Sequence, residues 1–153
     1  MGYYDRAGGL ATDGTPTFAT RQDAESEREV AALLSQRWSR EFHPFGALAA
    51  IDWWMSRHGR IVGVGEIKTR SHAVAQYPTV FLNVRKWLAL MLAGNGLNVP
   101  ALFIVRFSDG LRYLPVAEVD ASALRVGGCR QRVKSVSDVE PVIEVPVAGM
   151  RVV

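Results

Sequence analysis

Cysteine is almost absent from this chain: Cys129 is the single example among 153 residues. One thiol cannot form a disulfide within the chain, and it cannot build the cysteine cluster of a structural zinc site. The three histidines, His43, His58 and His72, do not show the spacing of paired metal ligands. These absences exclude a disulfide-bonded small domain and a zinc-cysteine fold, and we expect the protein to work in a reducing cytoplasm.

Long apolar runs are also missing. The longest stretch without a polar residue, glycine or proline near the middle of the chain is 87–93, and residues 1–20 lack the hydrophobic segment of a signal peptide. A helix that crosses a bilayer needs about 20 apolar residues, so we expect no membrane partner. A hydrophobic content of 48% and a charged content of 22% are ordinary for a globular protein, and the length suits one compact domain.

Charge is nearly balanced overall, at +3, but it is distributed unevenly. Residues 1–50 carry five basic and seven acidic side chains, residues 51–117 carry eight and three, and residues 118–153 carry five of each. A local basic excess is expected of a face that meets a polyanion such as nucleic acid. Basic side chains that only solubilise a sheet edge are the alternative explanation.

Residues 51–70 predict a β-hairpin, with two apolar strands joined by a turn over 57–59. Asp52 lies at the start of the first strand, and Glu66 and Lys68 lie at the end of the second. Side chains alternate faces along a strand, so Glu66 and Lys68 are expected to share one face. We place Val62 and Val64 on that face too, with Ile61 and Ile67 on the other.

Such a strand is apolar on both faces and therefore predicted to be buried, where charged groups need partners. Asp52, Glu66 and Lys68 are accordingly expected to meet near one end of the hairpin. Two converging carboxylates bind a hard divalent cation such as Mg²⁺ through oxygen. A lysine beside them can hold a phosphate or stabilise developing negative charge.

Residues 23–40 predict a helix with Asp23 as its N-cap. Its apolar stripe has helical spacing and contains Val30, Ala31, Leu34 and Trp38. Glu27 lies on this stripe, where a metal site would supply the partner that an inward glutamate needs. The alternative is that Glu27, one turn from the helix start, only favours the helix dipole.

Two parts of the sequence resemble a known superfamily. Asp52, a spacer of thirteen residues and Glu66-Ile67-Lys68 resemble the motif of the PD-(D/E)XK nucleases, although Ile51 stands where the motif has proline. Residues 26–34 are similar to the opening helix of archaeal-type Holliday junction resolvases, a branch of that superfamily. The resemblance continues through the apolar strand at 99–107 and covers roughly residues 24–117.

The resemblance implies an α/β fold with a restriction-endonuclease-like core. Its central mixed β-sheet would be flanked by helices, in the order α-β-β-β-α-β-β, with a first edge strand within 41–50. We divide the chain into a flexible arm over 1–21, a nuclease core over 22–117 and an extension over 118–153 packed on the core. An apolar strand is expected near 142–147 in that extension.

The resemblance further implies a DNA endonuclease that uses Mg²⁺, or Mn²⁺, to hydrolyse phosphodiester bonds in a bacterial, archaeal or phage-infected cell. Asp52, Glu66, the Ile67 carbonyl and Glu27 would hold the metal, and Lys68 would complete the catalytic set. One possible substrate is a four-way Holliday junction, which a homodimer would cut during DNA recombination or repair. The alternatives are a phage- or recombination-associated nuclease of single strands, ends or flaps, an inactive nucleic-acid-binding module, or a structural phage protein with a chance motif.

Residues beyond the motif supply candidates for nucleic-acid binding. Arg70 and His72 follow Lys68 and open a loop over 71–82, where a phosphate contact competes with simple solvation. A second helix over 84–93 is expected to be capped by Asn83 and ended by Gly94 and Gly96. Its first turn would present Arg85 and Lys86 to a phosphate, or to solvent. Its buried stripe is predicted to be Val84, Trp87, Leu88, Met91 and Leu92.

Overall fold

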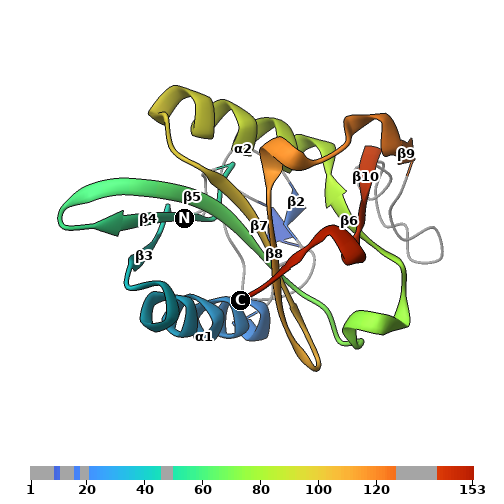
Figure 1. Cartoon of the computed structure of the whole chain (residues 1–153), viewed down its shortest axis with the longest axis horizontal. Helices are drawn as coiled ribbons and strands as arrows, with labels where there is room; N and C mark the ends of the chain where they lie inside the picture. The colour runs from blue at the N-terminus through green and yellow to red at the C-terminus, as the bar shows by residue number, and fades with distance from the viewer. Residues whose placement is uncertain (1–8, 11–15, 18–20, 46–49, 127–140) are drawn as a thin grey trace.

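A six-stranded sheet forms the centre of the protein in the computed structural model, which describes residues 9–10, 16–17, 21–45, 50–126 and 141–153 (Figure 1). Helices α1 (Arg21–Trp38) and α2 (Val84–Leu97) cover its two faces. The strand order is β11-β8-β7-β5-β4-β3. The strands are β3 (Glu41–Pro44), β4 (Trp53–Arg57), β5 (Arg60–Thr69), β7 (Ala101–Phe107), β8 (Gly110–Pro115) and β11 (Arg151–Val152). The predicted α/β core with its edge strand β3 is confirmed.

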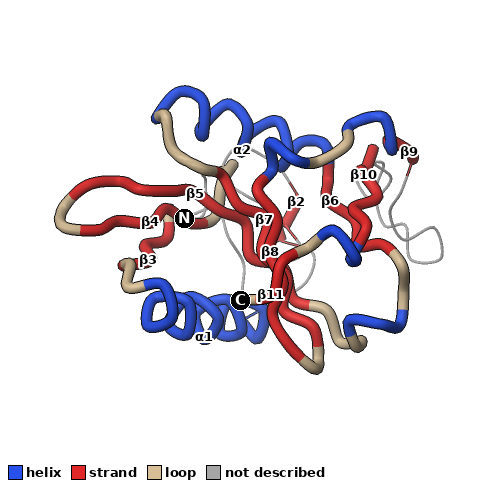
Figure 2. Tube along the Cα trace, in the orientation of Figure 1, coloured by secondary structure: helices blue, strands red, loops and turns tan. Residues whose placement is uncertain are grey.

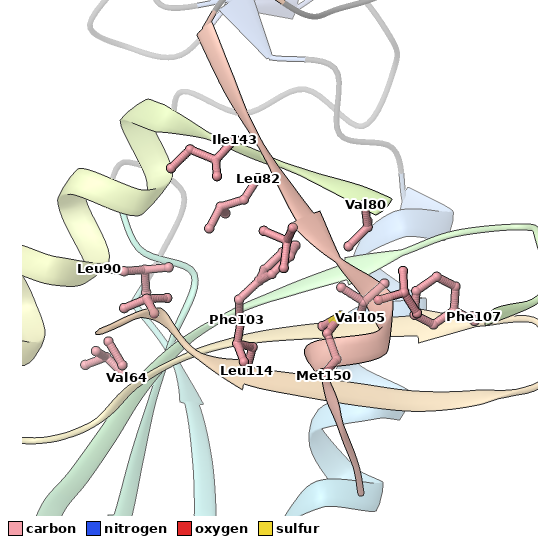
Figure 3. Packing of buried hydrophobic residues seen from close by; sticks show 14 residues of the cluster. Val64, Val80, Leu82, Leu90, Phe103, Val105, Phe107, Leu114, Ile143 and Met150 are labelled. Atoms are coloured by element: carbon pink, nitrogen blue, oxygen red, sulfur yellow. The ribbon is translucent and has the colours of Figure 1, made fainter. Parts of the chain in front are cut away.

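The sheet is mixed because α2 connects β5 to β7 in parallel, whereas the other neighbouring strands are antiparallel. Strand β7 is apolar on both faces, as a central strand must be. Leu102 and Ile104 pack on the α1 side with Leu34. Phe103 and Val105 pack on the opposite side, in the larger core cluster shown in Figure 3.

A second, three-stranded sheet lies beside the first and contains β6 (Thr79–Asn83), β10 (Pro141–Pro146) and β9 (Leu124–Val126) (Figure 2). The prediction of a loop over the whole of 71–82 is therefore wrong from Thr79 onwards. Strand β6 pairs with β10, whose partner residues lie about sixty positions later in the chain. Leu82 and Ile143 from this pair pack into the α2-side core (Figure 3).

Both helices differ in their bounds from the sequence prediction. Helix α1 begins at Arg21, so Asp23 lies inside it and is not its N-cap, and it ends where Ser39 adopts φ 52°. Helix α2 continues through Gly94 and Gly96 to Leu97, because Asn98 takes the left-handed cap with φ 52°. Gly94 is a packing glycine: a Cβ there would lie 3.1 Å from the Val99 carbonyl and 3.2 Å from the Ala101 side chain.

The β4–β5 hairpin is confirmed, with a turn in which His58 and Gly59 both have positive φ. Its face assignment needs one correction. Met55 pairs with Gly63 and Ser56 pairs with Ile61, so Val62 is the extra residue of a bulge. Val62 therefore packs on the α1 side while Val64 packs on the α2 side, and the two do not share a face.

Some predictions fall where the structure says little. Of the predicted arm over 1–21, the described backbone is strand β1 (Gly9–Leu10), its antiparallel partner β2 (Pro16–Thr17), and Arg21. The rest of the arm, together with residues 127–140 of the predicted extension and Cys129 among them, lies outside the described residues. Within the described part, neither helix has the length and apolarity needed to cross a bilayer.

Candidate active site

Asp52 and Glu66 are brought together by the register of the hairpin. Trp53, the first residue of β4, pairs with Gly65 of β5 in an antiparallel ladder. One step further along this ladder sets Asp52 opposite Glu66. Their interaction is one of the causes that raise the pKa of Glu66, so the two carboxyl groups lie close enough to repel each other.

Glu66 is buried in the centre of the sheet, with 7% of its surface exposed. Burial is the largest cause of a pKa raised well above the ordinary value of 4.5, followed by the hydrogen bond and charge of Asp52. Lys86 and Lys68 oppose this rise. Among the described residues, Glu66 Oε2 is buried and has no hydrogen-bond partner, although Lys86 Nζ lies at ion-pair distance.

Lys86 lies between the two carboxylates. Its Nζ is 2.7 Å from Asp52 Oδ1 and 3.2 Å from Glu66 Oε2. Burial alone would lower the pKa of Lys86, but the charges of Glu66 and Asp52 outweigh that effect and the pKa is raised. Lys86 was predicted to hold a phosphate or face solvent, whereas the structure places its ammonium in the carboxylate pair.

The helical period explains the position of Lys86. Leu90, four residues later, is the fully buried residue of α2, so Lys86 lies on the inner face of the helix. The predicted stripe is wrong in part, because Leu88 is 54% exposed and Leu92 is 76% exposed. A helix with apolar residues on all sides does not reveal its inner face by hydropathy, so the sequence did not identify Leu90, or Lys86 one turn before it, as inward-facing.

Lys68 follows Glu66 at the next position on the same face of β5. Its Nζ donates to Asn83 Oδ1 at 3.4 Å, and its charge acts to lower the pKa of Glu66. Asn83 precedes α2 with an extended backbone but makes no side-chain cap hydrogen bond. Asn83 therefore occupies the predicted N-cap position, but its side chain accepts from Lys68, fifteen residues away, instead of capping the helix.

Glu27 and Ile67 lie on the other side of the sheet. Glu27 Oε2 accepts a hydrogen bond from Trp53 Nε1 at 3.3 Å, and Trp53 packs in the α1-side core with the Ile67 side chain. Trp53 directly follows Asp52, so Glu27 contacts the residue next to the carboxylate pair. Among the described residues, no three His, Cys, Asp or Glu side chains gather closely enough to hold a metal ion. The site seen here is thus a pair of carboxylates with two lysines.

A polar cavity of about 430 Å³ opens at the end of β5, beyond Lys68. Arg70 forms part of its wall, and burial lowers the pKa of this guanidinium. Arg70 Nη1 donates one hydrogen bond, to the Thr69 carbonyl, and no ion pair of Arg70 occurs within the described ranges. Arg106, also in the wall, is held by Glu29 at 2.8 Å. Within the described ranges, Arg70 thus differs from Arg106, whose guanidinium is held by a carboxylate.

The other two predicted nucleic-acid ligands, His72 and Arg85, are not among the residues that line this cavity, although His72 contacts two that are, Phe107 and Ser108. His72 Nδ1 lies 3.0 Å from the Ala73 carbonyl oxygen, and its ring packs against Tyr77 and Phe107. Arg85 is exposed in the first turn of α2, next to Lys86. Arg70 and His72 lie in the loop that follows β5, whereas Arg85 lies in α2, and none of them lies between Asp52 and Glu66 as Lys86 does.

Comparison with known proteins shows which family and which known fold this chain is similar to. A family model described as "Phage putative PDDEXK endonuclease" matches residues 14–153. Among solved structures, the chain is similar to Hjc from Archaeoglobus fulgidus, described as a Holliday junction resolvase from an archaeal hyperthermophile. The two share 12% sequence identity with a TM-score of 0.53, over 84% of this chain and 92% of that chain, which shows a common fold. No curated protein sequence matches the chain.

Proposed function

The chain belongs to the phage PD-(D/E)XK endonuclease family, and from this premise we propose that it hydrolyses DNA phosphodiester bonds with Mg²⁺, or Mn²⁺, bound by Asp52 and Glu66. The observation that carries the proposal is the buried carboxylate pair beside Lys68. Burying two neighbouring carboxylates is costly unless a cation compensates their charge or one of them takes up a proton. In a nuclease, we therefore expect the reaction to take place at this carboxylate pair.

The residues fit a hard divalent cation. Glu66 Oε2 is a buried oxygen that accepts no hydrogen bond from the described residues and is ion-paired with Lys86, and Asp52 supplies a second carboxylate beside it. Oxygen donors of this kind suit Mg²⁺ and Mn²⁺ better than the softer metals. The backbone carbonyl of Ile67, between Glu66 and Lys68, is the proposed third oxygen. When bound, the metal would polarise the phosphate and lower the pKa of a water molecule.

The chain's own residues have separate roles in the reaction. A water oxygen forms a bond to phosphorus as the bond to the 3′-oxygen breaks; the water loses a proton and the 3′-oxygen gains one. The products carry 5′-phosphate and 3′-hydroxyl ends. Lys68, oriented by Asn83, positions the water and offsets the negative charge that develops on the phosphate. Glu27 is proposed to act beside the pair by fixing Trp53, the residue that follows Asp52.

DNA would be held along the end of the sheet where Glu66 and Lys68 lie. Arg70 is the best-supported phosphate ligand, because its partly buried guanidinium lines a polar cavity and has no carboxylate partner in the described part of the chain. His72 follows it in the same loop, and Arg85 extends from the first turn of α2. The basic excess of residues 51–117 supports contact with a polyanion in this region.

Two forms of DNA are candidate substrates. The fold shared with Hjc over most of both chains favours a four-way junction, which would require a homodimer that presents two sites to two strands. Single strands, ends or flaps are the second candidate, for which a monomer suffices. Intracellular action on phage or host DNA is consistent with either form.

One experiment tests both the activity and the substrate. The purified full chain is incubated with labelled junction, duplex and single-stranded DNA, and with single-stranded RNA, each in Mg²⁺, Mn²⁺ or EDTA. We expect cleavage of DNA with either metal and none with EDTA, and the ratio of junction to duplex cleavage identifies the substrate. Cleavage that is equal in EDTA would refute metal dependence, and cleavage of RNA alone would refute the DNA assignment.

A further inference from the structure

The position of Lys86 has a consequence for metal binding. Its ammonium lies 2.7 Å from Asp52 Oδ1 and 3.2 Å from Glu66 Oε2, so it contacts both carboxylates that are proposed to hold the metal. A divalent cation would be bound by these same two carboxylates. Mg²⁺ is held at about 2.0–2.1 Å by its oxygen ligands, and an ammonium cannot remain in the same place.

Repulsion between the two cations would be strong at this site. The side chains of Asp52, Glu66 and Lys86 are only 25%, 9% and 21% exposed, so water screens their charges weakly. A divalent cation can therefore bind both carboxylates only after Lys86 has moved away. The lysine can move, because four flexible carbons join its ammonium to the first turn of α2.

We infer that Lys86 is a tethered counter-ion that holds Asp52 and Glu66 together in the metal-free protein and leaves them when a divalent cation binds. The inference rests on the proposed function, since it takes these two carboxylates as the metal ligands. After it leaves the carboxylates, the ammonium stays close to the site because its side chain is anchored on α2. There it can bind a phosphate of the bound DNA. Lys86 is thus a positioning residue that lowers the affinity of the site for the metal ion.

The alternative is a permanent ion pair, in which Lys86 stays between the carboxylates and the metal binds elsewhere or not at all. The two accounts differ in the sign of one measurement. A competing lysine weakens Mg²⁺ binding, so its removal tightens it. A permanent structural lysine supports the carboxylates, so its removal weakens Mg²⁺ binding or leaves it unchanged.

The test is the Mg²⁺ dissociation constant of the full chain without DNA, measured by isothermal titration calorimetry. We expect Lys86→Met to bind Mg²⁺ about tenfold more tightly than the natural chain, because one buried positive charge is removed. Lys86→Arg, which keeps that charge, should bind Mg²⁺ as weakly as the natural chain. Arg85→Met is the matched control: it removes a charge from the adjacent exposed position and should change the affinity less than twofold.

A second measurement covers the case in which Lys86→Met folds poorly without metal. We expect its unfolding temperature, followed by circular dichroism, to rise more on adding Mg²⁺ than that of the natural chain; folding that depends entirely on Mg²⁺ is the extreme of this result. Unchanged or weaker Mg²⁺ binding by Lys86→Met overturns the inference. Loss of the proposed function looks different, because Mg²⁺ binding would then be unaffected by Asp52→Asn or absent from every variant.

Discussion

Trp53 lies directly opposite Gly65 in the β4–β5 ladder, and this pairing determines which side chains form the site. With this register, Asp52 lies opposite Glu66 on the α2 side while Trp53 faces α1. A slip of one residue would move every side chain of β4 to the other face and separate the two carboxylates. The close approach of β7 favours glycine here, since a Cβ at Gly65 would lie 3.3 Å from the Leu102 carbonyl.

Substitution of the proposed catalytic residues should remove activity without unfolding the protein. We expect Asp52→Asn and Lys68→Ala each to lower kcat/KM by about a thousandfold or more, because each removes a group that acts on the reacting phosphate. The measurement is single-turnover cleavage of labelled DNA in Mg²⁺, with circular dichroism to check the fold.

The matched control for the carboxylate is Glu118→Gln. Glu118 pairs with Arg151 on the surface, 49% exposed, where an ion pair contributes about 1 kcal/mol at most. Its substitution should leave cleavage unchanged. Activity of Asp52→Asn equal to that of this control would refute the assignment of the site.

The raised pKa of Glu66 predicts how the stability of the metal-free protein depends on pH. Folding favours the protonated carboxyl, so the folded state binds more protons than the unfolded state between the ordinary pKa of 4.5 and the raised one. The free energy of unfolding should therefore fall as pH rises through this window, by about 1.4 kcal/mol for each unit of pKa difference. Urea denaturation in EDTA from pH 4.5 to 8 measures it.

Glu66→Gln is the variant that isolates this effect. Glutamine does not titrate, so the fall in stability across the same pH window should shrink, and the variant should be more stable than the natural chain near pH 8. Mg²⁺ should reverse the order, because it would stabilise the natural chain and not the variant. An identical pH profile for both proteins in EDTA would show that Glu66 does not cause the fall.

Arg70 should contribute affinity for DNA rather than chemistry. We expect Arg70→Gln to weaken DNA binding at moderate salt and to reduce the slope of log affinity against log salt by about one, as for the loss of one phosphate contact. Fluorescence anisotropy in EDTA measures binding without cleavage. Arg57→Gln is the control, because Arg57 lies at the hairpin end of β4, away from the cavity at the far end of β5. An equal effect of both substitutions would indicate only a general loss of charge.

The sequence was sufficient to predict the core and its carboxylate pair because those features depend on local patterns. The alternation along β5 placed Glu66 and Lys68 together, and the apolar run of β7 marked a central strand. The second sheet could not be predicted in this way. Strand β6 gains its partner β10 only through contacts across the fold, and a five-residue segment alone does not reveal such a partner.

Other errors have equally specific physical causes. Gly94 looked like a helix terminator, yet its missing side chain lets α2 approach Ala101 closely. Val62 was assigned to the wrong face of β5, because the bulge adds one residue there and so breaks the alternation of side chains between Val62 and Val64. The role of Lys86 in the site depends on the distance between α2 and β5, which no sequence pattern contains.

The last prediction concerns coupling between metal and DNA. If Lys86 leaves the carboxylates for a DNA phosphate, DNA bound at the site should strengthen Mg²⁺ binding, and Mg²⁺ should strengthen DNA binding by the same factor. We expect this factor to be about tenfold in Lys68→Ala, a background chosen because it should not cleave the DNA. Calorimetric titration of Mg²⁺ with and without a short duplex measures it.

Removing Lys86 from the same background should reduce the coupling. The double variant Lys86→Met, Lys68→Ala is expected to bind Mg²⁺ tightly even without DNA. DNA should therefore tighten its Mg²⁺ binding by a smaller factor. The coupling factor should fall by the factor through which Lys86→Met alone tightens Mg²⁺ binding, because both changes remove the same competing charge. Coupling of equal size with and without Lys86 would mean that DNA strengthens metal binding only by its own phosphate oxygens. Lys86 would then have no part in linking the two ligands.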